Sequence, residues 1–285
     1  MKKRTLATTC AATALALAGL SAMADPAEDE LVINGDITIV THTDKAPDYI
    51  DGLSEQYSGW HFREDDTRNM ERDDFDNPGM LGVEAARDSW AEADGTEGKS
   101  CASCHNEPES MAGVRPVMPK FNTEKGEMYT LEMYINQCRT ERMGAEAWGW
   151  DDAAMVNMTA LISSVSRGMP MNVAIDGPAA PYWEQGKEMY YTRYGQLELS
   201  CANCHEDNYG NMIRADHLSQ GQINGFPVYR LKDAKLSSIH NRFKGCIRDT
   251  RAETFKPGSA EFIALELYVA SRGNGLSVEG PSVRN

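Results

Sequence analysis

Apolar residues recur at helical spacing in four stretches of this 285-residue chain. The stretches span residues 130–138, 155–165, 181–194 and 262–269. Apolar positions three and four residues apart predict amphipathic helices that each bury one face. Pro181 at the start of the third stretch and Gly195 just after it are typical of helix ends. Residues 31–40, by contrast, alternate as a strand does, and the whole pattern predicts a mainly α fold.

The predicted helices fall into two sets, and each set follows one copy of a five-residue motif. The motif reads Cys-Ala-Ser-Cys-His at 101–105 and Cys-Ala-Asn-Cys-His at 201–205. A lone cysteine follows each copy, Cys138 after 33 residues and Cys246 after 41, counted from the motif histidine. A Ser-Arg-Gly tripeptide then ends each set, at 166–168 and 271–273. This order indicates that one domain has been duplicated.

The five-residue motif is the attachment signature of a c-type haem. Two thiols at this spacing add to the two vinyl groups of one porphyrin, and the adjacent imidazole faces the iron. One copy could be a zinc ligand set or a redox pair beside a chance histidine, but two copies predict two covalently bound haems. The attachment thiols are Cys101, Cys104, Cys201 and Cys204, and the axial imidazoles are those of His105 and His205.

The domain organisation follows from these motifs. We expect a signal peptide at 1–24, an N-terminal extension at 25–80, a first cytochrome c-like haem domain at 81–175 and a second, with the active site, at 176–285. The Gly- and Pro-rich residues 168–181 are the expected linker between the domains. The extension has no haem motif, and its charge-dense residues 63–76 are interpreted as a solvated surface rather than a catalytic element.

The chain start predicts export. Lys2, Lys3 and Arg4 precede a mostly apolar stretch at 6–20 and an Ala-x-Ala cleavage site ending at Ala24. No later stretch approaches the roughly 18 apolar residues of a membrane span, so we expect a soluble periplasmic protein. The formal charge of −15 becomes −18 when the three leader cations are removed. Such a surface disfavours nucleic acid and anionic membrane, and favours basic protein partners.

The sixth ligand of each iron has several candidates. The first half offers Met169 and Met171 at about the distance expected of a Met ligand, whereas the second half offers no comparable Met. His217, His240, Cys246 and the lysines remain there. Cys138 and Cys246 could form a disulfide with each other in an oxidising compartment. Their equivalent places in the two repeats favour a thiolate bound to each haem instead.

Three features together resemble the SoxA family. They are the two attachment motifs, the cysteine that follows each, and the sequence Asn-Arg-Phe-Lys-Gly-Cys at 241–246. SoxA is the diheme subunit of the SoxAX cytochrome complex of bacterial thiosulfate oxidation. The resemblance covers nearly the whole mature chain, and the retained first haem motif is similar to that of the diheme type. It implies that Cys138 and Cys246 are the distal thiolates, that Cys246 carries a persulfide at the active site, and that Arg242 lies beside it.

The activity that this resemblance implies is that of an L-cysteine S-thiosulfotransferase. Thiosulfate is joined to a cysteine of a SoxYZ-like carrier protein, and two electrons pass to cytochrome c, with a SoxX-like monohaem cytochrome as heterodimer partner. Arg242 and Lys244 are the expected substrate-binding residues, and Arg242 shares a helical face with Cys246, the expected covalent relay. Further cations surround this stretch in an acidic chain: Arg230, Lys232, Lys235, Arg248 and Arg251.

Two other classes of protein remain open from the residues alone. A diheme electron carrier without transferase activity requires Met169 or Met171 and a second-half ligand that gives high-potential irons. A diheme peroxidase requires an open iron position with an acid/base residue over it, for which His217 and His240 are the candidates.

Overall fold

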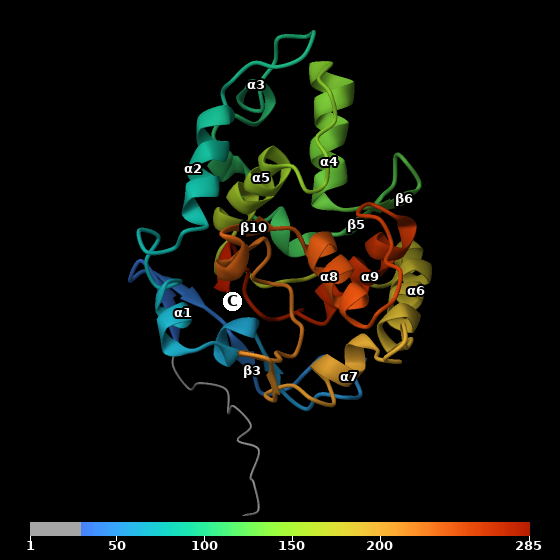
Figure 1. Ribbon diagram of the computed structural model, residues 1–285. Helices are drawn as coiled ribbons and strands as arrows, with labels where there is room; N and C mark the ends of the chain where they lie inside the picture. Colours follow the sequence, from blue (N-terminus) through green and yellow to red (C-terminus); the bar gives the residue numbers. More distant parts are fainter. Residues whose placement is uncertain (1–29) are drawn as a thin grey trace, which may run out of the picture.

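Two pairs of packed helices form the framework of the computed structural model, which describes residues 30–285. Helix α2 (Met80–Ser89) packs on α5 (Ala153–Ser164), and α6 (Ala180–Tyr191) packs on α9 (Ala260–Ser271). Figure 1 shows the first pair in the upper part of the molecule and the second below it on the right. The predicted signal peptide lies outside the described residues.

Short elements surround the two helix pairs. The remaining α-helices are α1 (Asp65–Asn69), α3 (Ala102–His105), α4 (Leu131–Gln137), α7 (Cys201–His205) and α8 (Ile239–Asp249). A π-helix (Cys138–Met143) continues α4, and 3-10 turns occur at Gly59–Phe62, Pro108–Met111, Arg115–Val117, Gly177–Ala179 and Leu231–Asp233. None of the helices described at residues 30–285 is long and apolar enough to span a membrane.

The strands are short, two or three residues each. They are β1 (Leu31–Ile33), β2 (Ile37–Ile39), β3 (His42–Thr43), β4 (Gln56–Tyr57), β5 (Lys120–Asn122), β6 (Glu127–Tyr129), β7 (Met212–Ile213), β8 (Asp216–His217), β9 (Val228–Arg230), β10 (Lys235–Ser237) and β11 (Ser282–Arg284). Consecutive strands pair as antiparallel hairpins, and β9 also pairs in parallel with the C-terminal β11. The strand predicted at 31–40 is such a hairpin, because Asn34 and Gly35 adopt positive φ and reverse the chain.

The predicted helices are present, and side-chain caps explain where two helices of the second half begin. Ser238 accepts a hydrogen bond from the Asn241 amide at the start of α8, and Ser259 accepts one from the Phe262 amide at the start of α9. The stretch predicted at 181–194 ends as a helix at Tyr191, because Thr192 takes an extended conformation.

The backbone repeats itself between the two halves, as the motifs predict. The bridge Asp94–Lys99 precedes the first motif and Tyr194–Leu199 the second. Gly113 and Gly221 both have positive φ, and each lies six residues before a cis proline, Pro119 or Pro227. The eight extra residues of the second half therefore lie between His205 and Gly221, where they form the hairpin β7–β8.

The N-terminal segment, residues 30–79, packs against the rest of the molecule, so its interpretation as a solvated surface holds for only part of it. Leu31, Ile33, Ile39 and Trp60 form a small core of their own. The charge-dense part is only partly exposed: Arg63 is 7% exposed and pairs with Asp216, and Glu71 is 2% exposed and pairs with Arg284, whereas most of its aspartates are exposed. The charges of Arg63 and Glu71 avoid solvent because partners distant in the sequence neutralise them.

The expected linker, 168–181, connects the halves but is not a free tether. Met171 and Val173 are buried in the core of the second half. The Met171 amide donates to the Leu276 carbonyl at 2.8 Å, which fixes the linker to the chain end after α9.

Helices α6 and α9 approach each other most closely at Gly186. A Cβ atom at this position would lie 2.0 Å from the carbonyl oxygen of Ala264. The first-half counterpart is Ala86, so α2 and α5 leave room for a methyl group that α6 and α9 do not.

Gly186→Ala should therefore destabilise the protein by about 1–3 kcal/mol, because the two backbones must separate to admit the methyl group. Chemical denaturation of the haem-loaded protein measures this change. Gln185→Ala, on the exposed face of the same helix, should stay within about 0.5 kcal/mol of the wild type. Equal stability of the two variants would show that the helix crossing is not tight.

Candidate functional site: two cysteine–histidine centres

The first half encloses an apolar cavity of about 480 Å³ beside its attachment motif. Cys101, Cys104 and His105 lie on its wall, and Cys138, at the end of α4, lies on the wall as well. Most of the remaining wall is apolar, with Trp90, Met118, Leu131, Ile135, Trp148, Met158 and Ile162. Two thiols, an imidazole and a large apolar space fit a covalently attached haem.

Trp90, at the C-terminus of α2, fixes the first motif in place. Its carbonyl accepts a hydrogen bond from the Ala102 amide at 3.0 Å, and its indole Nε1–H donates to the Asn106 carbonyl at 2.7 Å. The indole ring centroid is 6.1 Å from that of His105. The helix pair α2–α5 is thereby connected directly to the turn that presents the haem-binding side chains.

In the second half, a capping box begins the helix that carries the motif. The Ser200 hydroxyl accepts from the Asn203 amide, and the Asn203 side chain accepts from the Ser200 amide. Burial raises the pKa of Cys201 to about 12 and also raises that of Cys204, and in both the neighbouring Cys246 thiol adds to the rise. Cys246 thus lies next to both attachment thiols.

His205 is prepared as a metal ligand. Its Nδ1 is 2.7 Å from the Ser219 carbonyl, to which it donates, so Nε2 is left with its lone pair. Burial lowers the pKa of His205 to about 4, which keeps the imidazole neutral. Gly221 packs against the ring, because a Cβ atom there would lie 2.9 Å from His205 Cγ. These contacts fit an axial ligand of a haem.

Helix α8 presents Arg242 and Cys246 one helical turn apart. Arg242 lines a pocket of about 120 Å³ together with Ile239 and Phe243 of the same helix. We find no ion pair or side-chain hydrogen bond for Arg242 among residues 30–285. In the first half the position four residues before the lone cysteine is Tyr134, which also lines its cavity. The first cavity also has Arg139 and Arg142 on its wall, so the two centres share a thiol with guanidinium groups nearby and differ in the residue one turn before that thiol.

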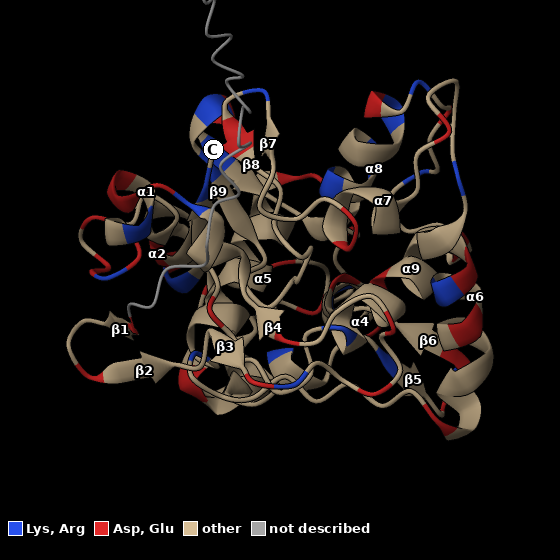
Figure 2. Ribbon diagram, turned by 90° about the horizontal axis from the view of Figure 1, so that it is seen from below, with Lys and Arg blue, Asp and Glu red and all other residues tan. Residues whose placement is uncertain are grey.

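Four arginines gather at the pocket of the second half: Arg63, Arg230, Arg242 and Arg284. They come from the N-terminal segment, β9, α8 and β11. Burial and the neighbouring arginines lower the pKa of Arg63 to about 9 and that of Arg230 to about 10. In Figure 2 the C-terminus, β9 and the hairpin β7–β8 lie together, with Lys and Arg segments beside them.

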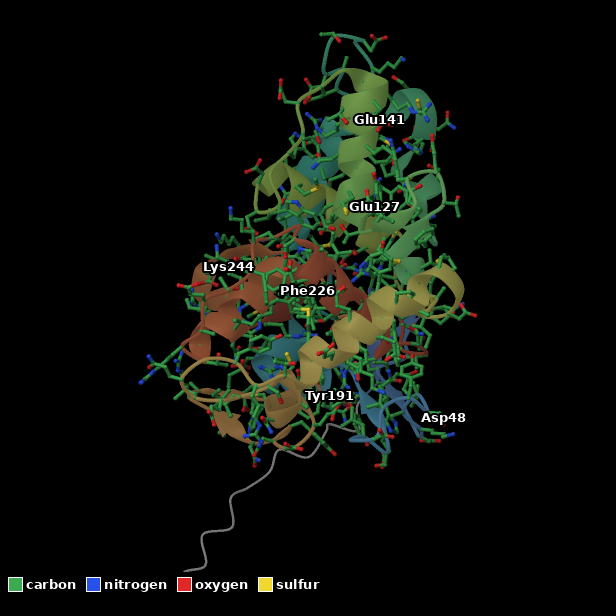
Figure 3. All side chains as sticks on the ribbon, turned by 90° about the vertical axis from the view of Figure 1, so that its right-hand side faces the viewer. Asp48, Glu127, Glu141, Tyr191, Phe226 and Lys244 are labelled. Atoms are coloured by element: carbon green, nitrogen blue, oxygen red, sulfur yellow. The ribbon has the colours of Figure 1, made fainter. Side chains whose placement is uncertain are left out.

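The other predicted candidates lie elsewhere. Lys244 is not on the pocket wall, and Figure 3 shows it near the edge of the molecule while Phe226, a pocket residue, lies at the centre. Met169 and Met171 are absent from the wall of the first cavity, and Met171 is 1% exposed in the core. Cys138 and Cys246 are free thiols, each beside its own motif, so the structure contains no disulfide between them.

The two histidine candidates differ in their surroundings. His240 is fully buried, accepts from the Gly258 amide at 3.0 Å and lies 3.0 Å from Glu266. It is a core residue. His217 lines the pocket, and its Nδ1 lies 3.8 Å from Glu64.

Sequence reasoning missed Trp90 and the two arginines from the chain ends, Arg63 and Arg284. The difference of eight residues between the two His-to-Cys distances was the available signal, because the extra hairpin provides Asp216, the ion-pair partner of Arg63.

The repeated fold and its two thiol–imidazole centres define a c-type cytochrome with a duplicated haem domain. A family model described as the SoxA/TsdA cytochrome c domain matches residues 85–171 and 185–278. The chain belongs to the SoxA family.

Relatives match almost the whole chain. The L-cysteine S-thiosulfotransferase subunit SoxA of Paracoccus pantotrophus is 63% identical over 99% of this chain and 98% of its own length. That of Rhodovulum sulfidophilum is 59% identical, over 95% of this chain and 94% of its own. A crystal structure of SoxXA from P. pantotrophus matches with a TM-score of 0.89 at 64% identity, over 92% of this chain and 100% of the other.

Gly221→Ala should alter the axial ligation of the haem at His205. The new methyl group meets the imidazole, and positive φ adds a cost of about 1–2 kcal/mol. Gly113→Ala is the matched control, since it has the same backbone conformation but no atom closer than 3.9 Å. The low-spin EPR spectrum should change in Gly221→Ala alone; a change of the same size in both variants would contradict the contact with His205.

Proposed function

We propose that the chain catalyses the oxidative conjugation of thiosulfate to a cysteine of a carrier protein, at a centre formed by Cys246 and Arg242. Two covalent haems would be held, one by Cys101 and Cys104 and the other by Cys201 and Cys204. His105 and His205 would be the proximal ligands of their irons, and Cys138 and Cys246 the distal thiolates. The observation that carries the assignment is the place of Cys246 beside the second pair of attachment thiols, one turn from a guanidinium without an acidic partner among the described residues.

The difference between the two halves supports the choice of Cys246 over Cys138. Thiosulfate is a dianion, and a chain with a formal charge of −15 repels it except where cations gather. Arg242 offers a planar fork of donors to the sulfonate oxygens, at the position where the first half has Tyr134. The first cavity has Arg139, which pairs with Asp94, and Arg142, whereas four arginines gather at the second pocket. Lys244 contributes to the local positive charge without lining the pocket.

The chemistry balances as an oxidation by two electrons. The terminal sulfur of thiosulfate and a thiol sulfur form a disulfide bond, the thiol loses one proton, and two electrons leave. Cys246, as a thiol or as a persulfide, is the relay that holds one of these sulfurs before transfer to the carrier cysteine. The haems accept electrons one at a time, and a second one-electron acceptor on a partner cytochrome takes the other electron.

The partners follow from this balance. A monohaem cytochrome of the SoxX type forms the heterodimer and passes electrons to cytochrome c, and a SoxYZ-like carrier supplies the acceptor cysteine. The reaction takes place in the periplasm, to which the predicted signal peptide at 1–24 directs the chain. The similar P. pantotrophus chain was crystallised as part of SoxXA, which supports the first partner.

Cys246→Ala should abolish the conjugation of thiosulfate to the carrier thiol, because the covalent relay is lost. Cys138→Ala is the matched control: it should change the spectrum of one haem and retain most of the activity. Intact mass should show two haems on both variants, which separates loss of chemistry from loss of cofactor. Conjugation at the normal rate by Cys246→Ala would contradict the mechanism.

Arg242 should act through its charge and its fork of donors. Arg242→Ala should lower the rate by about a hundredfold or more, comparable to the loss of a donor from an anion site. Arg242→Lys, which keeps the charge, should lie between this variant and the wild type. Steady-state rates against thiosulfate concentration measure both, and wild-type rates in both variants would remove Arg242 from the site.

A further inference from the structure

The arginine pocket of the second half is continuous with the second haem site. In the first half, Met118, Leu131 and Ile135 line the haem cavity together with the attachment motif. Their counterparts in the repeat, Phe226, Ile239 and Phe243, line the arginine pocket. The residues that position His205, Ser219 and Gly221, line it too. The pocket is therefore one end of the space that corresponds to the first haem cavity.

This end is closed by residues that have no counterpart in the first half. Arg63 comes from the N-terminal segment, Arg284 from the C-terminal strand, and Asp216 and His217 from the eight-residue insertion. The position of Arg230, three residues after the cis proline, is occupied in the first half by the uncharged Asn122. The second haem site thus has an arginine-rich end that the repeat itself does not supply.

The charges at this end are not balanced. Arg63 pairs with Asp216 and also donates to the His217 carbonyl at 2.6 Å. Arg284 pairs with Glu71 and Glu279. Within residues 30–285, neither an ion pair nor a side-chain hydrogen bond is found for Arg230. The residue opposite it in the β9–β11 register is Arg284, which has the same charge. The half-buried guanidinium of Arg230 would be stabilised by a bound anion.

The second haem itself has such anions. Its macrocycle is apolar and matches the apolar pocket walls at Ile223, Phe226 and Phe243. Its two propionates are carboxylates and match the arginine-rich end. We propose that Arg230, with Arg63 beside it, binds the propionate carboxylates of the second haem, so that the segment before the haem repeats is part of this haem's site. The assignment rests on the second covalent haem of the proposed function, and it leaves Arg242 to the substrate.

The alternative occupant of the pocket is the oxyanion of thiosulfate, which the same guanidinium groups would attract. The haem propionates and thiosulfate can be distinguished, because a cation that binds one affects a different measurement from a cation that binds the other. A cation at the propionates stabilises the reduced haem, whereas a cation at the substrate changes the dependence on thiosulfate concentration.

The test is a redox titration of the second haem in the haem-loaded complex, followed by EPR, with its signal identified by the change in Cys246→Ala. Arg230→Gln should lower the midpoint potential of this haem and leave that of the first haem unchanged. Arg230→Lys, which keeps the charge, should restore most of the potential. Arg214→Gln is the matched control, because Arg214 is exposed on the hairpin β7–β8 and does not line the pocket.

A second measurement covers the case in which Arg230→Gln does not assemble. Arg230→Lys should shift the propionate bending band in the resonance Raman spectrum, because the fork of donors is lost. A potential and a Raman band equal to those of the wild type would overturn the proposal. If the potential of the Arg230 variant is unchanged but the variant needs more thiosulfate, the proposal is overturned and the pocket binds substrate. Normal conjugation by the same variant would leave the proposed function standing.

Discussion

One turn of helix must present two thiols and an imidazole to the same flat ligand, and this constraint organises the molecule. The turn is only four or five residues long, in α3 and α7, so it has little stability of its own. Each copy is therefore held from outside, by Trp90 in the first half and by the Ser200 capping box in the second. The two helix pairs support these turns, and the close approach of α6 and α9 at Gly186 fixes the second helix pair.

Duplication supplied two such turns, and later differences gave them different chemistry. Cys138 and Cys246 occupy the same place relative to their motifs, yet their helical neighbours one turn earlier are Tyr134 and Arg242. The first centre has a largely apolar wall that also carries Arg139 and Arg142. The second has four arginines at its pocket, and three of them come from elements other than α8.

The sequence allowed the helices, the duplication and the side chains of both centres to be predicted, because these depend on local spacing. Apolar periodicity placed α4, α5, α6 and α9, and the motif placed both histidines. The burial of Arg63 and Glu71 could not be predicted, since their partners, Asp216 and Arg284, lie more than a hundred residues away. The sequence of a charge-dense stretch does not show whether its charges are solvated by water or paired with opposite charges far along the chain. Lys244 does not line the pocket, because helical phase turns it away from Arg242, and its role in substrate binding stays a prediction.

The span of chain that closes each site has a consequence for the order in which the two sites form. The first cavity is lined by residues 90 to 162, which form a contiguous part of the chain. The second pocket is lined by residues from 59 to 284, almost the whole described length. During synthesis from the N-terminus onward, the first site can be completed while the rest of the chain is still being made. The second can close only after the last residues have been added, so the order of synthesis sets an order of assembly.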